Sequence, residues 1–142
     1  MDKPKRRRPP LRLLLVEDNK HDVLAFKRSF KDSGVAHHIT HYPRAETALN
    51  RLTDAADDFD LVICDYNLPG MSGFEMCKSL LAQNIDLPLV LLTGDGAETL
   101  AVEAIKAGVN DYIVKDPNQG YLSLLPVILP EVMRQFQDRR AR

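Results

Sequence analysis

The chain has 142 residues, a length that suits one domain with a sizeable core and leaves no room for a second. Hydrophobic residues make up 44% of it, and 20 acidic against 19 basic residues leave no overall charge that would attract nucleic acid or a membrane surface. No apolar run approaches the ~20 residues of a membrane span, so we expect a cytoplasmic protein.

The two ends of the chain are basic. Residues 1–10 combine a cluster of lysine and arginine with three prolines and contain nothing apolar beyond Met1. Such a segment cannot bury enough apolar surface to fold, so we expect a disordered basic tail there. Three arginines make residues 139–142 a basic C-terminal end. The folded domain is expected between them, over residues 11–138.

The first half of the chain alternates predicted strands with predicted helices. Residues 11–16 are apolar except for Arg12, which is typical of a strand buried on both faces of a sheet. Apolar residues recur at helical spacing over residues 21–33 and again over residues 44–55. Between these helices, residues 35–42 contain three histidines, and this composition favours a shorter, more exposed strand at the edge of the sheet.

The second half contains two further apolar runs that end in polar residues. Residues 61–64 form an unbroken apolar run that stops at Asp65. Residues 87–92 form another, which stops at Thr93 and is followed by a glycine-rich loop. Both runs are typical of strands buried on both faces in a parallel sheet, so each polar residue should stand at the carboxyl end of its strand.

A helix is expected after each of these runs. Ser72 and Glu75 form a capping-box sequence at the start of the first helix. Apolar residues at helical spacing predict the second helix over residues 97–107. A short strand over residues 111–114 then ends at Lys115.

The last segment, residues 121–139, has apolar residues at helical spacing but also contains Pro126 and Pro130. Proline fits the first turn of a helix and disrupts its interior. The sequence therefore leaves two alternatives open. The helix begins near Pro126 and is kinked at Pro130, or its start is delayed further.

Five strands alternating with five helices predict an α/β fold: a doubly wound, five-stranded parallel sheet with helices on both faces. All the strand ends then point the same way, and one edge of the sheet carries Glu17, Asp18, Asp65, Thr93 and Lys115. Two carboxylates about 4 Å apart repel by roughly 4 kcal/mol at an effective dielectric of about 20. The cluster therefore needs a cation, which is Lys115, a metal or both, and its oxygen ligands suit Mg²⁺.

Four motifs resemble those of response regulator receiver domains of two-component signal transduction. They are Leu-Leu-Val-Glu-Asp-Asn at residues 14–19, Asp-Tyr-Asn-Leu-Pro-Gly-Met-Ser-Gly at 65–73, Leu-Leu-Thr-Gly at 91–94 and Asp-Tyr-Ile-Val-Lys at 111–115. Together they are highly specific, and the resemblance covers roughly residues 11–137. It implies a flavodoxin-like sheet with the strand order 2-1-3-4-5.

The resemblance also implies how the protein would act. Asp65 would accept a phosphoryl group from a sensor histidine kinase or a histidine phosphotransfer protein. Thr93 and Lys115 would contact the phosphoryl oxygens. Tyr112 would be the aromatic switch residue that follows Thr93 inward when the phosphoryl group arrives. On this reading the protein is a phosphoacceptor in a bacterial phosphorelay.

A metal ion is part of the same implied site. The resemblance implies that Glu17, Asp18 and Asp65 hold Mg²⁺ together with the backbone carbonyl of Asn67. The cation and the lysine would neutralise charge on the transferring oxygens, and positioning would supply most of the remaining rate enhancement.

The output is expected to be a change in protein binding. The sequence has no segment after Arg142 that could be a DNA-binding or catalytic domain, which suggests a stand-alone receiver. Phosphorylation should then alter the face made by the fourth helix, the fifth strand and the last helix, and change affinity for a kinase, a phosphotransfer protein or a second copy. The alternative is a fragment of a larger regulator whose basic end continues into another domain.

One position departs from the family pattern. Receivers usually have proline directly after the lysine, often with a cis bond, whereas here Asp116 stands between Lys115 and Pro117. A cis bond before a non-proline residue costs about 2.5–4 kcal/mol, so the sequence leaves the geometry of this turn open.

Two other classes of protein share this architecture. A phosphatase of the haloacid-dehalogenase class needs a second Asp two residues after its nucleophile, but this chain has Asn67 there, which cannot transfer a proton. A flavodoxin-like binding module cradles a phosphate in its first loop, where Glu17, Asp18 and Asp22 would repel one. We therefore expect a receiver that turns over no external substrate and at most hydrolyses its own phosphoryl group.

Overall fold

The computed structural model describes residues 9–94 and 96–140. Most of the predicted basic tail, residues 1–8, and the last two residues of the basic end, 141–142, lie outside the described residues. The two remaining tail residues belong to no helix or strand, and the first two residues of the basic end continue the last helix.

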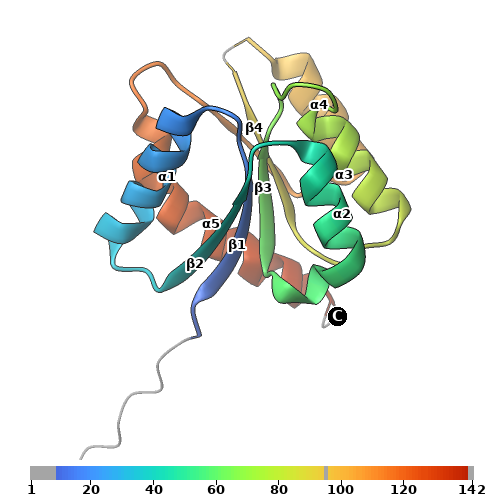
Figure 1. The fold of residues 1–142 in the computed structure, drawn as a ribbon, viewed down its shortest axis with the longest axis horizontal. Helices are drawn as coiled ribbons and strands as arrows, with labels where there is room; N and C mark the ends of the chain where they lie inside the picture. The colour runs from blue at the N-terminus through green and yellow to red at the C-terminus, as the bar shows by residue number, and fades with distance from the viewer. Residues whose placement is uncertain (1–8, 95, 141–142) are drawn as a thin grey trace, which may run out of the picture.

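Five strands form one parallel sheet in the order β2-β1-β3-β4-β5, as predicted (Figure 1). Their bounds are β1 Leu11–Val16, β2 His37–Tyr42, β3 Leu61–Asp65, β4 Leu89–Thr93 and β5 Asp111–Val114. The histidine-containing strand β2 lies at the edge of the sheet, and β3 lies at its centre. The acid that ends β3 therefore stands in the middle of the carboxyl edge.

Five α-helices cover both faces of the sheet, which confirms the doubly wound arrangement (Figure 1). Their bounds are α1 Lys20–Ser33, α2 Ala45–Ala55, α3 Gly73–Ala82, α4 Glu98–Ala107 and α5 Gly120–Arg140, and a short 3₁₀ helix, η1, spans Ala56–Asp58. Helices α1 and α5 pack on one face, and α2, α3 and α4 pack on the other. Within the described residues no helix has the length and apolar character needed to cross a bilayer.

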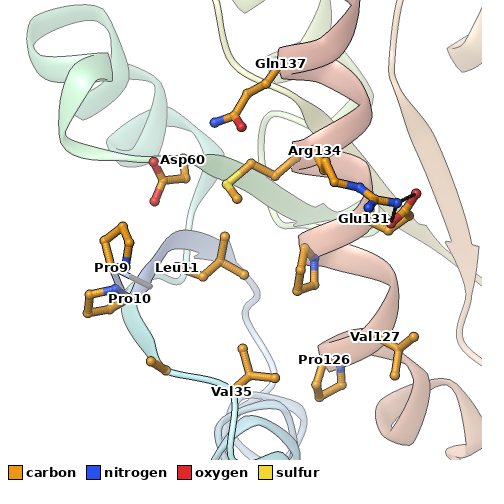
Figure 2. A pocket seen from close by; sticks show the side chains of 13 residues that line it. Pro9, Pro10, Leu11, Val35, Asp60, Pro126, Val127, Glu131, Arg134 and Gln137 are labelled. Carbon is orange, nitrogen blue, oxygen red and sulfur yellow. Dashed lines mark hydrogen bonds and ion pairs between the residues drawn. The ribbon is translucent and has the colours of Figure 1, made fainter. Parts of the chain in front are cut away.

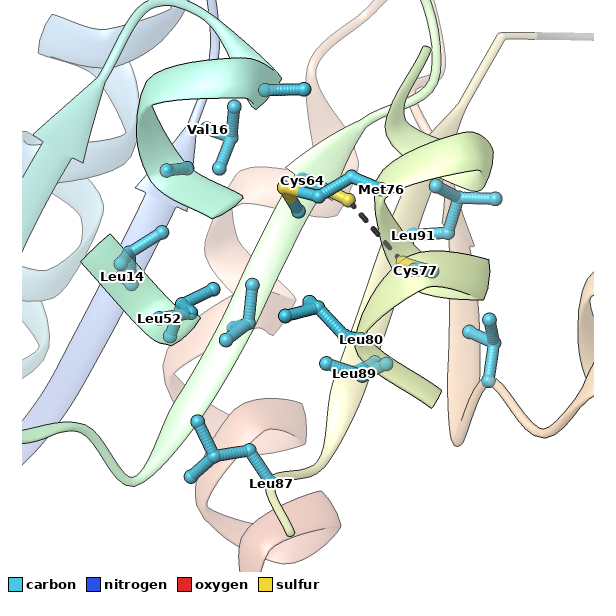
Figure 3. Close-up of a cluster of buried hydrophobic side chains, with 14 of the residues drawn as sticks. Leu14, Val16, Leu52, Cys64, Met76, Cys77, Leu80, Leu87, Leu89 and Leu91 are labelled. Atoms are coloured by element: carbon cyan, nitrogen blue, oxygen red, sulfur yellow. Dashed lines mark hydrogen bonds between the residues drawn. The ribbon is translucent and has the colours of Figure 1, made fainter. Parts of the chain in front are cut away.

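Alternation along β1 divides the core into two layers. Leu13 and Leu15 pack with α1 and α5, whereas Leu14 and Val16 pack with the helices of the opposite face. Successive side chains of a strand point to opposite faces, so a strand that is apolar throughout is buried on both. Figure 3 shows the layer that contains Leu14 and Val16, packed against side chains from α2, α3 and β4.

Polar caps fix where the helices begin beside the carboxyl edge. The side chain of Asn19 accepts a hydrogen bond from the amide of Asp22 at 3.1 Å and so caps α1. The hydroxyl of Ser72 likewise accepts the amide of Glu75 at 3.1 Å, which confirms the predicted start of α3. Each cap satisfies an amide that would otherwise lack a partner at the helix start.

Helix α5 differs from both alternatives left open by the sequence. It begins at Gly120, ahead of Pro126 and Pro130, and both prolines lie inside it. Its start is determined by Asp116, whose carboxylate accepts the amides of Gly120 at 2.9 Å and Tyr121 at 2.8 Å. Apolar residues along α5 are buried against α1 and the sheet, and this packing outweighs the amide lost at each proline.

A groove of about 700 Å³ lies at the amino ends of β1 and β2, beside α5 (Figure 2). Pro9, Pro10, Leu11 and Val35 line one side of it, and residues of α5 from Pro126 to Gln137 line the other. The polar strand ends predicted from the sequence are at the opposite edge of the sheet. This groove is therefore not the predicted site, since none of the predicted site residues lines it.

Candidate functional site

The polar residues predicted at the strand ends gather at the carboxyl edge of the sheet. Glu17 follows β1, Asp65 ends β3, Thr93 ends β4 and Lys115 follows β5. Among the residues that the structure describes, the buried ones with polar or charged side chains are Glu17, Asp65 and Thr93, at 2%, 8% and 1% exposure. Burying polar side chains costs free energy unless partners compensate. Proteins accept such a cost mainly at functional sites, so this edge is the candidate site.

The ammonium of Lys115 joins three carboxylates at this edge. It lies 2.8 Å from Oδ2 of Asp65 and 3.1 Å from Oδ2 of Asp22, and it also donates to Oε1 of Glu17. An ammonium has three N–H bonds, so each carboxylate receives one of them. The predicted cluster of Glu17, Asp65 and Lys115 is present. Asp22 joins it, although we expected that residue only to repel a phosphate.

Burial and charge shift the acid and the base of this cluster. Burial raises the pKa of Glu17 to about 8, helped by a hydrogen bond with Asp65 and opposed by Lys115. Burial lowers the pKa of Lys115, but hydrogen bonds to Asp65 and Glu17 outweigh this effect and raise its pKa overall. Lys115 is therefore a permanent positive charge at neutral pH, while Glu17 holds a proton that an incoming cation can displace.

Three of the acids also form a group that fits a cation. Carboxylate oxygens of Glu17, Asp18 and Asp65 all lie within 4.8 Å of one another. Glu17 and Asp65 are buried, whereas Asp18 is exposed and opens the cluster to solvent. Several carboxylate oxygens with room for water are the donor set that Mg²⁺ takes, so these residues fit the ion.

Asn67 lies beside the phosphoacceptor candidate. Its amide donates to Oδ1 of Asp65 at 3.2 Å, which places its backbone next to the acid cluster. The use of its carbonyl as a metal ligand stays a prediction.

The peptide bond between Lys115 and Asp116 is trans, since no described peptide bond is cis, and the turn is closed by the Asp116 cap of α5.

Two residues that the sequence did not single out support the loops of the site. Nε2 of His41 donates to the backbone carbonyl of Glu17 at 2.7 Å. Oε1 of Glu46 accepts the amide of Met71 at 2.8 Å, in the loop that follows Asp65. The sequence signal for His41 was its place near the end of an edge strand, which the parallel register sets beside Leu15. Nothing local in the sequence points to Glu46.

The predicted switch residues occupy contrasting environments. Thr93 is buried at the end of β4, whereas Tyr112 on the neighbouring strand β5 is 39% exposed. Further apolar side chains are exposed on α4 and β5: Val102, Ile105 and Val114. Strand β5 pairs with the strand that ends at Thr93, but the switching roles of Thr93 and Tyr112 stay predictions.

A doubly wound parallel sheet with polar side chains at its carboxyl edge defines the class of α/β proteins that bind their ligands at the carboxyl ends of the strands. The chain belongs to the response regulator receiver domain family, whose model matches residues 13–124. Members of this family are signalling modules that typically bind Mg²⁺ in an acidic pocket, which corresponds here to Glu17, Asp18 and Asp65.

Individual proteins resemble this chain in sequence or in fold. The response regulator RppA of Synechocystis sp. is 34% identical over 133 residues, which cover 93% of this chain and 51% of RppA. The phosphorylated cyanobacterial phytochrome response regulator RcpA superposes with a TM-score of 0.76 at 25% identity, covering 87% of this chain and 93% of RcpA. The receiver domain of the Francisella response regulator 1452 has a TM-score of 0.75 at 21% identity, covering 88% and 98%. The chain spans less than a third of the length of several other curated relatives.

Proposed function

We propose that this protein is a phosphoacceptor of a two-component phosphorelay in the cytoplasm, and that Asp65 receives the phosphoryl group. The observation that carries the proposal is the environment of Asp65. Its buried carboxylate ends the central strand, with one oxygen 2.8 Å from the ammonium of Lys115 and the other 3.2 Å from the amide of Asn67. A carboxylate held this way is a fixed nucleophile beside a permanent positive charge.

The donor is a sensor histidine kinase or a histidine phosphotransfer protein. A carboxylate oxygen of Asp65 attacks phosphorus, an O–P bond forms, and the bond from phosphorus to the histidine nitrogen breaks with its electron pair moving to that nitrogen. Lys115 neutralises negative charge on the phosphoryl oxygens, and the hydroxyl of Thr93 donates to one of them. Mg²⁺, when bound, adds positive charge for the same oxygens.

The acid cluster is well suited to this cation. Glu17, Asp18 and Asp65 supply carboxylate oxygens, and the carbonyl of Asn67 supplies a fourth oxygen ligand in the proposal. Glu17 would give up its proton to serve as a ligand, because a metal ligand must be deprotonated. With Glu17 and Asp65 holding the ion, the ammonium of Lys115 would have N–H bonds free for the phosphoryl group.

Output follows from the surface next to Thr93. The phosphoryl group draws in the hydroxyl of Thr93, and Tyr112 moves inward from its exposed position on β5. The face made by α4, β5 and α5 then changes its affinity for a partner protein or a second copy. Its exposed apolar side chains support this assignment, because apolar surface in contact with water favours association: Val102, Ile105, Tyr112 and Val114.

The decisive experiment is intact mass after exposure to a small phosphodonor with and without Mg²⁺. We expect one added phosphoryl group that depends on Mg²⁺ and disappears in Asp65→Asn. Asp32→Asn is the matched control, since Asp32 is an exposed acid on α1 away from the cluster. Labelling of Asp65→Asn to the same extent as the parent would show that Asp65 is not the acceptor.

A second measurement addresses the output. Partner or self-association affinity is compared with and without a phosphoryl mimic, in the parent and in Thr93→Ala. We expect the mimic to change affinity in the parent and to have little effect in Thr93→Ala, because coupling between the two sites passes through that hydroxyl. If affinity and the amide exchange of residues 96–125 are unchanged in the parent, the protein relays the phosphoryl group without switching this face.

A further inference from the structure

Asp22 contacts Lys115 but does not belong to the acids that fit a cation. Its Oδ2 lies 3.1 Å from the ammonium, and its side chain is 26% exposed. The oxygens that cluster within 4.8 Å of one another come instead from Glu17, Asp18 and Asp65. Asp22 is thus the partner of Lys115 that a metal ion would leave in place.

The backbone of Asp22 is fixed by the fold. It lies in the first turn of α1, and its amide donates to the cap residue Asn19 at 3.1 Å. Val23, the next residue, is buried against the sheet and α5. The carboxylate therefore extends from a rigid position, which is what is needed to hold a long, flexible lysine side chain in one orientation.

We propose that Asp22 is a positioning residue that keeps the ammonium of Lys115 directed at the phosphoryl group during transfer to Asp65. This inference rests on the proposed function. In the structure the three N–H bonds of Lys115 are shared among Glu17, Asp22 and Asp65. With Glu17 and Asp65 holding Mg²⁺ and Asp65 phosphorylated, two of these N–H bonds would be free for phosphoryl oxygens, and the third would stay on Asp22.

Retaining this third partner matters because a free lysine side chain has many rotamers. Without this contact the ammonium would sample orientations toward solvent or toward the other acids. Part of the free energy of binding the phosphoryl group would then be used to order the lysine side chain. A charge-assisted hydrogen bond to a fixed carboxylate removes that cost before the phosphoryl group arrives. Asp22 also carries negative charge that repels the donor, so its effect on donor binding and its effect on the transfer step have opposite signs.

The test compares Asp22→Ala and Asp22→Asn with Asp32→Asn, which makes the same charge change at an exposed site on the same helix. The rate of Asp65 phosphorylation is measured over a range of phosphodonor concentrations with saturating Mg²⁺. Mg²⁺ affinity is titrated separately without donor. Far-ultraviolet circular dichroism establishes that each variant is folded.

We expect Asp22→Ala to lower the saturating rate about tenfold, the size of effect expected when an oriented charge-assisted hydrogen bond is lost. Asp22→Asn keeps an oxygen acceptor and should recover part of the rate, to about a third of that of the parent. Mg²⁺ affinity should change by less than about threefold in both variants, and Asp32→Asn should match the parent. If Asp22 only stabilised α1, its replacement would instead change the saturating rate and the Mg²⁺ affinity together.

Several results would overturn the inference. A saturating rate in Asp22→Ala equal to or above that of the parent would do so, as would an equal loss in Asp32→Asn. If Asp22→Ala does not fold, Asp22→Asn decides the question, and a rate indistinguishable from the parent then counts against the inference. These outcomes leave phosphorylation of Asp65 in the parent intact. Failure of the proposed function would appear differently, as a parent that takes up no phosphoryl group or an Asp65→Asn variant that does.

Discussion

The carboxylate of Asp116 accepts the amide hydrogen of Tyr121 at 2.8 Å, so the residue that directly follows Lys115 is the cap of α5. The same carboxylate accepts the amide of Gly120 at 2.9 Å. The backbone that carries the lysine is thereby tied to the start of a 21-residue helix. A trans peptide with an acidic cap thus closes the turn at the position where related receivers usually have proline.

Asp116→Ala should lower the thermal unfolding temperature, and the loss should depend on pH. The amides of Gly120 and Tyr121 lower the pKa of Asp116 below its ordinary 3.8 because they bind the ionised form. Its stabilisation is therefore present above pH 3.8 and is lost as pH falls through the lower pKa of the folded state.

The check is the difference in unfolding temperature between parent and Asp116→Ala from pH 7 down to pH 2. We expect the difference to shrink below about pH 4, the ordinary pKa of an aspartate. Asp116→Asn should retain part of the cap at every pH, because asparagine is also a good cap residue. A difference that stays constant down to the lowest pH would contradict the role of the ionised carboxylate.

Mg²⁺ binding at pH 7 should release protons. The pKa of Glu17 is raised to about 8, chiefly by burial, so this carboxyl group is largely protonated in the metal-free protein at neutral pH. A ligand to Mg²⁺ must be ionised, so affinity should rise as pH increases toward about 8. Titration calorimetry in two buffers with different heats of ionisation measures the released protons, and identical apparent enthalpies would refute the prediction.

The raised pKa of Glu17 should also make the stability of the metal-free protein depend on pH. A group whose folded pKa is raised stabilises the fold below its unfolded pKa, here 4.5, and this contribution is lost as pH rises through about 8. Glu17→Gln cannot ionise, so its unfolding temperature should fall less than that of the parent between pH 5 and pH 8. Parallel curves for the two proteins would rule out Glu17 as the titrating group.

Gly73→Ala should be strongly destabilising although alanine favours helices. A Cβ at Gly73 would lie 2.2 Å from the backbone oxygen of Asp65 and 3.2 Å from Sγ of Cys64, so α3 would have to move away from β3. Overpacking of this kind costs ~1–3 kcal/mol or more. Gly94→Ala is the control, since a Cβ there meets nothing within 4 Å. Equal chemical unfolding midpoints for the two variants would show that the close approach is unimportant.

The two cysteines should resist alkylation in the native protein. Sγ of Cys64 lies 3.7 Å from Sγ of Cys77, and both thiols are fully buried between β3 and α3 (Figure 3). The hydrogen bond with Cys77 and burial raise the pKa of Cys64 well above its ordinary value, which removes the reactive thiolate. Labelling followed by mass spectrometry should therefore proceed only as fast as unfolding exposes the thiols. Rapid labelling without denaturant would contradict this account.

The strands were predictable because their signal is local, whereas their order followed only from the resemblance to receiver domains. An unbroken apolar run such as residues 61–64 can be buried only between two layers of helices, and a parallel sheet then brings all the strand ends to one edge. Asp65 and Lys115 could be assigned to a common site for that reason alone. The resemblance of the motifs added the roles of these residues, which the geometry does not itself test.

The contacts that were missed depend on packing between distant elements. Nothing around Asp22 in the sequence shows that its carboxylate reaches Lys115, because that contact depends on the position of α1 relative to the end of β5. The start of α5 was misplaced because proline's local preference was weighed without the Asp116 cap and the buried apolar face. In both cases tertiary contacts decide between conformations that the local sequence leaves open.

The residues of the acid cluster lie far apart in the sequence, and this limits when the cluster can form during folding. Lys115 is 98 positions from Glu17 and 50 from Asp65, so the three side chains can meet only after the last strand has joined the sheet. A partly folded chain without β5 lacks the ammonium, although Glu17, Asp18 and Asp65 already lie together at the ends of β1 and β3. An ion held by these acids at 100 times its dissociation constant would stabilise the fold by about 2.7 kcal/mol. Opening of the last strand removes a positive charge and leaves the acids in place, so it should strengthen ion binding.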